Sequence, residues 1–402
     1  MPEILVPLSV DTIPVTLTGT GSAVPFPPPP QRARWQILTG PATGGYSQEL
    51  AAAQNRKYTR RLEEADDLSF DMSALRDLAE PISPLATDAH LLWTPPGGGT
   101  ARPLMRGRFG GTGNALDPNT HRLTPTVLDY RAVLDNRQLW SDSQLTWAGI
   151  DQAEIVWQLI QQAQTRTGGD LGISKGWTGI YPTGTLRDRT YEAGNKIGER
   201  ITELSQVING FDWAITPTSA SALRLDVWAP ERGTNRGVVF ESGGLVTHAR
   251  REYDIKGYGN ALRYTGADGL TPVEIEASDL ATRPEGRWDL AFGDTGLITQ
   301  SALDDRAAWQ LEQSQNIEPV YTMRLRPGCW GGPDDFDVGD SARVVIYGGG
   351  LEVDTIQRIY EMAFSIDASG VETLEVTTGG PKPDRARKAV SIDRRLKNLE
   401  LR

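Results

Sequence analysis

The sequence predicts a mainly β protein in which two related small β-barrels flank an α/β insertion, with a helix at the C-terminal end. Three observations carry this prediction. The 402 residues allow about two to four domains. The 43 glycines and 26 prolines, beside 38% hydrophobic residues, suit short strands joined by turns. Short apolar segments with strand patterns also recur on both sides of a helical middle.

Residues 1–34 precede the first strand pattern and form a proline-rich N-terminal arm. The run from Pro25 to Pro30 contains five prolines, which predicts a stiff polyproline segment. We expect it to act as a spacer or to lie on a neighbouring molecule. A proline ligand for a signalling domain is the less favoured alternative.

Residues 35–140 predict the first β-barrel domain. Leu68, Phe70 and Met72 alternate strictly with polar residues, as in a strand with one buried face. A brief helix is expected from Ser73 to Glu80. The other strand candidates, separated by Gly, Pro, Asn and Asp, are Trp35 to Leu38, His90 to Trp93, Leu104 to Phe109 and Leu123 to Tyr130.

Residues 141–244 predict an α/β domain of two helices and a hairpin. Asp151 followed by Glu154 resembles a capping box, and helical spacing continues from Ile155 to Ala163 before Gly168 and Gly169. The remaining elements are a helix from about Glu192 to Asn209, stopped by Gly210, and a hairpin of Phe211 to Thr216 with Leu223 to Trp228.

Residues 245–380 predict the second β-barrel domain, with a polar and helical insertion near 266–315. Its strand candidates are Leu245 to Tyr264, Ala342 to Tyr347, Asp354 to Tyr360, Met362 to Ile366 and Val371 to Thr377, and its helix is Ser301 to Gln315. The strand, turn, strand order from Arg106 to Val127 recurs from Arg358 to Val376. This recurrence suggests an internal repeat.

Residues 381–402 follow a Gly-Pro-Lys-Pro breaker and predict a C-terminal helix with a coiled-coil pattern. Ala389, Ile392, Leu396 and Leu399 recur at spacings of three, four and three, which aligns them on one seam. Because so short a helix is marginal alone, we expect it to be ordered by copies of itself or by a neighbouring protein. Folding back onto its own body is the alternative.

The formal net charge of −11 argues against a nucleic-acid reader, because such binding rests on clustered Lys and Arg. The single cysteine, Cys329, excludes an intrachain disulfide framework and predicts a buried or half-buried small residue. No apolar run approaches the ~18 residues of a membrane span, and the first residues lack a signal-peptide pattern. We therefore expect a soluble chain made in the cytoplasm.

We predict no catalytic, cofactor-binding or metal-binding residues, so the protein is not expected to be an enzyme. His90, His121 and His248 are the only histidines, and each stands alone. Gly19 to Gly21 and Gly110 to Gly113 lack a complete dinucleotide fingerprint and are expected to be turns. The acidic run Asp334, Asp335, Asp337 and Asp340 lacks the spacing of a calcium loop and predicts a turn before a strand at Ala342.

A glycoside hydrolase is an alternative that sequence cannot exclude by motif, since it needs only two carboxylates at a separation set by the fold. The eleven tryptophans would then include sugar-stacking platforms. Their spread along the chain instead favours core and interface packing. Those considered as platforms are Trp93, Trp140, Trp147, Trp177 and Trp330.

Seven short segments, in order, resemble minor tail proteins from long-tailed phages of actinobacteria. The shared order is a stronger signal than any one segment, and the likeness extends from about Trp35 to Thr378. The segments are Leu68 to Leu75, Met105 to Phe109, Leu128 to Trp140, Ile155 to Ala163, Arg187 to Tyr191, Leu204 to Trp213 and Phe336 to Asp340.

The resemblance implies a structural virion protein similar to the central baseplate or tail-tip hub of tailed phages. Such hubs have two related β-barrels and an inserted α/β domain, and form a homotrimer whose six barrels make a pseudo-sixfold ring below the sixfold tail tube. Expected partners are the distal tail or tube protein above, tip or fibre proteins below and the tape measure protein, with any host-surface contact indirect. The N-terminal arm has no counterpart in the hub body.

The resemblance also suggests a reason for the acidity. Three chains carry 3 × −11 = −33 formal charges, and carboxylates facing the bore would keep a passing genome from adhering. Two other classes stay open: a receptor- or carbohydrate-binding tail module, which needs an exposed aromatic cluster, and a cell-wall hydrolase, which needs paired carboxylates in a cleft.

Overall fold

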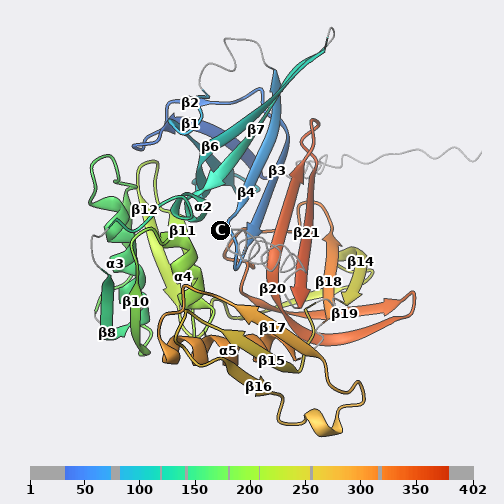
Figure 1. Ribbon diagram of the computed structural model, residues 1–402. Coiled ribbons are helices and arrows are strands. Elements are labelled where there is room, and N and C mark those ends of the chain that lie inside the picture. Colours follow the sequence, from blue (N-terminus) through green and yellow to red (C-terminus); the bar gives the residue numbers. More distant parts are fainter. Residues whose placement is uncertain are drawn as a thin grey trace, which may run out of the picture.

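The computed structural model describes residues 32–73, 82–117, 120–140, 144–179, 182–207, 209–253, 257–315 and 319–379. Thirteen of the described strands form one large sheet, which curls through the upper and right-hand parts of Figure 1. Its strands are β1 (Arg34–Pro41), β2 (Gln48–Glu49), β3 (Gln54–Arg61), β4 (Asp67–Ser73), β5 (Thr87–Thr94), β6 (Arg102–Asp117), β7 (Thr120–Asp129), β13 (Asn235–Glu241), β14 (Val246–Tyr253), β18 (Pro319–Leu325), β19 (Ser341–Gly348), β20 (Leu351–Ile366) and β21 (Glu372–Gly379).

The sheet consists of two parts with the same strand order. The first half-sheet runs β1-β5-β6-β7-β4-β3, with the two-residue β2 added at its edge, and the second half-sheet runs β13-β19-β20-β21-β18-β14. Numbered along the chain, both orders are first, fourth, fifth, sixth, third, second. One pairing differs in direction, because β1 and β5 are antiparallel while β13 and β19 are parallel.

The two longest strands correspond in detail. β6 and β20 each have 16 residues, and each pairs with the preceding strand along its first half and with the following strand along its second half. The ladder has an irregularity at Gly110 in β6 and at Tyr360 in β20. Each is preceded by an arginine and a fully buried apolar residue, namely Arg108-Phe109 and Arg358-Ile359. The structure thus supports the internal repeat suggested by the sequence.

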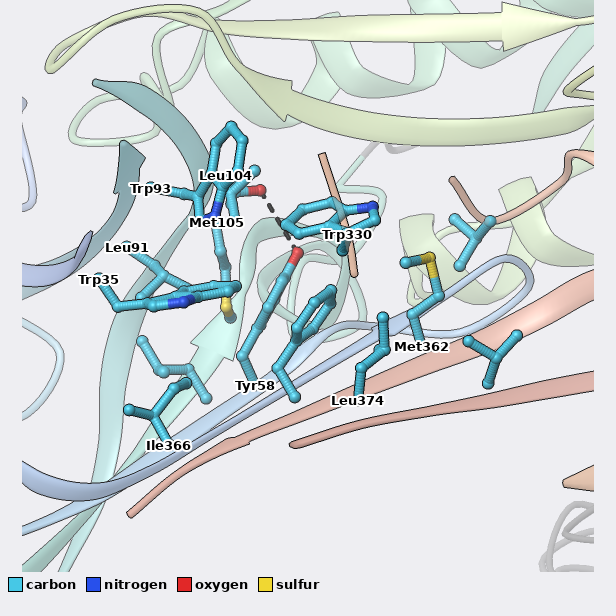
Figure 2. Close-up of a cluster of buried hydrophobic side chains, with 14 of the residues drawn as sticks. Trp35, Tyr58, Leu91, Trp93, Leu104, Met105, Trp330, Met362, Ile366 and Leu374 are labelled. Carbon is cyan, nitrogen blue, oxygen red and sulfur yellow. Dashed lines mark hydrogen bonds between the residues drawn. The ribbon is translucent and has the colours of Figure 1, made fainter. Parts of the chain in front are cut away.

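The half-sheets join where β3 pairs with β20, from Arg61 opposite Glu361 to Arg56 opposite Ile366. One hydrophobic core crosses this junction. Trp330, from the loop after β18, packs its ring 6.1 Å from that of Trp35 in β1 and 4.7 Å from that of Phe364 in β20, as centroid distances. Figure 2 shows these tryptophans facing one another beside Tyr58. The half-sheets therefore share their interior.

The middle of the chain, drawn in green in Figure 1, folds against this sheet around its own core. Two small sheets accompany the helices, β10 with β8 and β11-β12-β9. The elements are α2 (Tyr130–Leu134), β8 (Leu145–Asp151), α3 (Gln152–Gln164), β9 (Ile173–Lys175), β10 (Leu186–Tyr191), α4 (Ile197–Ser205), β11 (Asp212–Pro217) and β12 (Leu223–Trp228).

Local chemistry sets the helix ends here. The carboxylate of Asp151 accepts from the backbone N–H of Ala153, which confirms the predicted N-cap of α3. The carboxylate of Glu154, which was expected to complete a capping box, lies 2.5 Å from the ammonium group of Lys175 instead. The second helix begins at Ile197, later than predicted, because Asn195 and Lys196 bond to the chain near Leu139. It ends at Ser205, before the predicted end at Asn209, so Gly210 is not its stop. Ile197, Ile201 and Leu204 form its apolar face and are fully buried.

Residues 257–315 contain a third core over a small sheet. The predicted strand from Leu245 to Tyr264 is two strands in different sheets, β14 and a first strand of this small sheet, and the other two strands of the small sheet were not predicted. The sheet has the order β16-β15-β17 and packs against the predicted helix, at the bottom of Figure 1. Its elements are β15 (Ala261–Thr265), β16 (Val273–Glu276), the 3-10 turn η1 (Leu280–Thr282), β17 (Asp289–Gly293) and α5 (Gln300–Ser314). This unit stands in the chain between β14 and β18.

Two strand predictions need correction. Gly110 to Gly113 is not a turn, because these residues continue β6 opposite β7, with only a ladder irregularity at Gly110. The predicted strands Asp354 to Tyr360 and Met362 to Ile366 are a single strand, β20, with a similar irregularity at Tyr360. In both cases a local break in alternation marks a bulge. The predicted helix after Ser73, the N-terminal arm and the C-terminal helix lie outside the described residues, and the domain boundaries remain predictions.

Candidate functional site

The predicted self-association seam, Ala389, Ile392, Leu396 and Leu399, lies outside the described residues and remains a prediction. The described residues present a different candidate, one face of the large sheet. Along the strand path β14-β18-β21-β20-β3-β4-β7, residues directly opposite each other in an antiparallel ladder lie on the same face. The registers therefore sort the side chains of these strands into two sets.

One face packs on the shared core and the other is polar. On the core face, Tyr58, Leu68 and Phe364 are almost fully buried. The other face, called the polar face, also carries the apolar residues Leu128 and Val320. Its remaining residues are Lys57, Thr59, Arg61, Asp67, Ser69, Asp71, Arg122, Thr124, Thr126, His248, Arg250, Glu252, Thr322, Arg324, Glu361, Ala363, Ser365, Thr373, Glu375 and Thr377. In the sequence, the local sign of this face is the period-two placement of the polar residues His248, Arg250 and Glu252.

The charges of the polar face are paired with one another. Among its described residues, five Asp or Glu stand beside five Lys or Arg. Arg61 bonds to Glu361 across the junction at 3.2 Å, and Arg324 bonds to Glu375 at 2.8 Å. The other pairs are Arg61 with Asp67, Arg122 with Asp71 and Arg250 with Glu252. Because most of its guanidinium groups already face carboxylates, this surface offers phosphate groups little net attraction.

At one end of the polar face, the two half-sheets border a groove of about 390 Å³. Asp71 in this groove accepts hydrogen bonds from Asn55 at 2.9 Å, Thr124 at 3.0 Å and Arg122. Burial acts to raise the pKa of Asp71, but these hydrogen bonds outweigh it and the pKa lies below its ordinary value. Lys57 and Asp367 also line the groove. The groove is thus lined by polar groups that are largely bonded to one another.

A buried triad of charged side chains, Arg60, Arg232 and Asp337, links β3 to the second half-sheet. The carboxylate of Asp337 lies 3.1 Å from the guanidinium of Arg60 and 2.7 Å from that of Arg232. All three side chains are no more than 13% exposed. A carboxylate between two guanidinium groups satisfies charges that would be costly to bury alone. The triad therefore holds three distant parts of the chain together.

A buried carboxylate pair lies beside this triad. The backbone N–H of Asp66 donates to the Asp129 carboxylate at 2.9 Å, and the Tyr58 hydroxyl donates to the Asp66 carboxylate at 2.8 Å. Burial, with the nearby Asp66 charge, raises the pKa of Asp129 to about 7. The adjoining cavity has a volume of only about 30 Å³, room for roughly one water molecule. A sugar ring cannot reach these carboxylates as they stand.

Of the described side chains, those of His90, His248 and the acidic run do not come together as a reactive site. The side chain of His121 lies outside the described part of the structure. His90 is buried, and burial together with the Arg106 charge lowers its pKa to about 4, while His248 lies on the polar face. Asp337 and Asp340 pair with arginines, and a turn precedes β19 as predicted. Among the described residues, no group of three His, Cys, Asp or Glu side chains is arranged to hold a metal ion.

Of the tryptophans considered as stacking platforms, Trp93, Trp147 and Trp330 are buried in the cores, which confirms the packing interpretation for them. Trp140 is 67% exposed. Cys329 is half-buried as predicted, and burial raises the pKa of its thiol to about 11. In the described part of the chain, no helix is both long and apolar enough to cross a membrane.

No protein family model matches this sequence, and neither does any curated protein. Solved structures with a similar fold exist, however. The 43 kDa tail protein of prophage MuSo2 from Shewanella oneidensis has a TM-score of 0.56 at 14% identity, with 85% of this chain and 97% of that chain covered. The tail protein from Neisseria meningitidis MC58 has a TM-score of 0.55 at 13% identity, with coverages of 87% and 96%.

A third similar structure is the prophage tail protein gp18 from Listeria monocytogenes EGD-e, with a TM-score of 0.52 at 9% identity, covering 91% of this chain and all of that chain. In each case the likeness extends over nearly the whole of the other protein. The chain therefore has the fold of prophage tail proteins.

Proposed function

We propose that this chain is a structural tail protein of a long-tailed phage, serving as the hub that joins the sixfold tail tube to the threefold tail tip. The observation that carries the proposal is the shared strand order of the two half-sheets. Three copies of a chain with two equivalent halves supply six similar positions around an axis. Such a ring can match a sixfold tube on one side and a threefold tip on the other.

The polar face is the part we assign to the lining of the central channel. Its opposite face is covered by the shared core, so only the polar face is available to water over these strands. Its balanced, paired charges differ from the acid excess that the net charge had suggested for the bore. Neutralised guanidinium groups keep DNA from adhering without requiring net repulsion. The excess of acidic over basic residues in the chain then lies outside the polar face.

The partners follow from this position. We place the distal tail or tube protein above the ring and tip or fibre proteins below it, with the tape measure protein in or near the channel and host-surface contact indirect. The chain is made in the host cytoplasm and ends in the virion at the tail tip. The origin in an actinobacteriophage and the clasping role of residues 1–34 are part of the same proposal.

Mass measurement and imaging test the hub. Three copies of the 43.9 kDa chain have a mass of about 132 kDa, which light scattering or native mass spectrometry resolves from a monomer. Imaging of intact particles labelled for this chain is expected to find it on the tail axis at the tip. Label on the capsid shell or on radially projecting fibres would refute the proposal.

Incubation of the purified protein with host cell walls separates the remaining alternatives. Release of sugar or peptide fragments indicates a hydrolase, and tight co-sedimentation without cleavage indicates a receptor- or carbohydrate-binding module. We expect neither. The exposed aromatic residues of the described chain lie on separate elements, among them Tyr46 after β1, Tyr253 at the end of β14 and Tyr347 in β19, rather than in one platform.

A further inference from the structure

Each half-sheet has an outer face, turned away from the shared core, over its first, fourth and fifth strands. The ladder irregularities of the two longest strands equate Arg106 of β6 with Ile356 of β20. Their ladder partners, His90 and Arg343, therefore correspond as well. Val353 of β20 is buried in the shared core, so Ile356, three residues further on, lies on the opposite side of the sheet.

In the first half-sheet the chain covers this outer face itself. α2 begins directly after β7, and the hydroxyl of its Tyr130 donates to the carboxylate of Asp88 in β5 at 2.7 Å. The guanidinium of Arg106 lies 5.2 Å from the centre of the Tyr130 ring. The ring of Tyr46 packs against that of His90, with 4.8 Å between centroids. Arg106 and His90 are almost fully buried as a result.

In the described part of the structure, the equivalent face of the second half-sheet is bare. Arg358 at its start bonds to Asp212 of β11, but the next residue on this side, Ile356, is 60% exposed. Tyr347 is 61% and Val239 is 41% exposed. This surface, at the lower right of Figure 1, is called the bare face. Its residues, from β13, β19 and the first half of β20, are Val239, Glu241, Arg343, Tyr347, Glu352, Asp354 and Ile356.

The chain that follows β21 holds the place that α2 holds in the first half-sheet. β7 and β21 are the sixth strands of the two orders, and residues 380–402 come directly after β21. β21 ends beside Ile359 of β20, three residues or about 10 Å from Ile356. Ten residues from Gly379 to Ala389 reach at most about 36 Å. The predicted seam can therefore lie over the bare face.

We propose that residues 381–402 dock on the bare face of their own chain, as α2 packs on the equivalent face of the first half-sheet. The predicted seam from Ala389 to Leu399 then covers the exposed side chains of Ile356 and Tyr347. The inference goes beyond the proposed hub function, because it concerns a contact within one chain and requires no second copy.

The charges of the segment and of the bare face are complementary. Residues 381–402 contain eight Lys or Arg and three Asp or Glu, a formal charge of +5. The bare face carries Glu241 and Glu352, and Arg343 beside them already bonds to Asp354 at 2.7 Å. Its remaining charge is negative, so a basic segment is attracted to it, most strongly at low salt.

The predicted seam also matches the bare face in length. From Ala389 to Leu399 a helix rises about 15 Å. Along β20, Ile356 and the residue opposite Tyr347 are four positions apart, or about 13 Å. One seam can therefore cover both exposed apolar side chains.

Thiol labelling tests the docking in the full-length chain. Ile356→Cys in a Cys329→Ser background places a reporter thiol on the bare face. Its rate of maleimide labelling is compared between the natural seam and a seam carrying Ile392→Asp and Leu396→Asp. We expect the natural seam to slow labelling about tenfold, because a docked segment must open before the thiol reacts. Trp288→Cys, in the separate unit of β15 to α5, is the control and should label equally fast with either seam.

Reversal of charge on the bare face is an independent measurement. Glu241→Lys with Glu352→Lys is expected to speed labelling of the Ile356→Cys reporter about threefold, because two exposed attractions become repulsions. The matched control is Glu274→Lys with Glu276→Lys in β16, which makes the same change of charge on another unit and should leave the labelling rate unchanged.

Equal labelling of the reporter thiol with the natural and the altered seam would overturn the docking. Protection that grows with protein concentration would overturn it as well, because the covering segment would then belong to another copy. Native mass measured on the same samples separates this inference from the hub. A trimer without protection refutes the docking alone, whereas protection in a chain that is monomeric at every concentration supports the docking and contradicts the hub.

Discussion

The two half-sheets differ at one edge although their strand orders agree. β20 has β3 along its second half, while the matching part of β6 has β7 alone among the described residues. The difference shows that the same strand order in two halves of a chain does not give both halves the same strand neighbours. One copy of the junction is made within the chain, between β3 and β20, and the described residues contain no second copy of it at β6.

The half-sheets also differ in what the chain inserts between corresponding strands. In the first half-sheet a short turn joins β3 to β4, whereas in the second the unit of β15 to α5 stands between β14 and β18. The strand order survives this insertion of a separately packed unit. Topology is therefore carried by the ladder pairings and not by the lengths of the connections.

A substitution of Trp330 tests whether the two half-sheets unfold as one cooperative unit. We expect Trp330→Ala to lower the free energy of unfolding by about 4 to 5 kcal/mol, because the ring fills the shared core. Urea unfolding followed by circular dichroism measures this loss. Trp288→Ala, at a position 51% exposed, serves as the control with a small effect. Two separate transitions in the wild type would show that the halves fold independently.

Removing the central carboxylate of the ion triad tests the junction itself. Asp337→Asn leaves the Arg60 and Arg232 guanidinium groups without their shared countercharge, and we expect a loss of about 3 to 4 kcal/mol. The matched variant Asp334→Asn removes a carboxylate that is 77% exposed and is expected to cost less than about 1 kcal/mol. Equal losses in the two variants would contradict a structural role for the triad.

The carboxylate pair at the end of the first half-sheet predicts a dependence on pH. Because the pKa of Asp129 rises to about 7 on folding, the folded state holds a proton that the unfolded state releases above about pH 4. The free energy of unfolding is therefore expected to fall by about 2 to 3 kcal/mol as the pH rises from 4 to 7, with the neighbouring Asp66 limiting the full effect. Asp129→Asn should remove this component of the decline.

The smallest expected effect concerns the polar face of the second half-sheet. Glu375→Gln breaks an ion pair with Arg324 in which both side chains are at least 40% exposed, and we expect a stability loss below about 1 kcal/mol. If the face lines a channel, the same variant should raise the retention of the protein on a DNA column at low salt, because Arg324 is released. Unchanged retention would argue against the paired charges acting to keep phosphate away.

Local sequence patterns correctly predicted those elements whose buried residues or ends follow from residue spacing alone. The alternation of Leu68, Phe70 and Met72 matches β4, and the cap at Asp151 begins α3. The same patterns failed in Gly110 to Gly113, where a bulged strand looks like a turn, and across residues 266–293, where β16 and β17 have only four and five residues. Their strand structure comes from pairing with β15.

The sequence by itself determined the β-rich composition, the start of α3 after Asp151 and the repeated strand and turn rhythm, since these follow from residue spacing and backbone preference. Only the tertiary structure decided that Arg61 meets Glu361, that Asp337 lies between Arg60 and Arg232, and that most charges of one sheet face are paired. The physical reason is distance along the chain: such contacts join residues 105 to 300 positions apart. Their energy depends on burial and register, which no local pattern encodes.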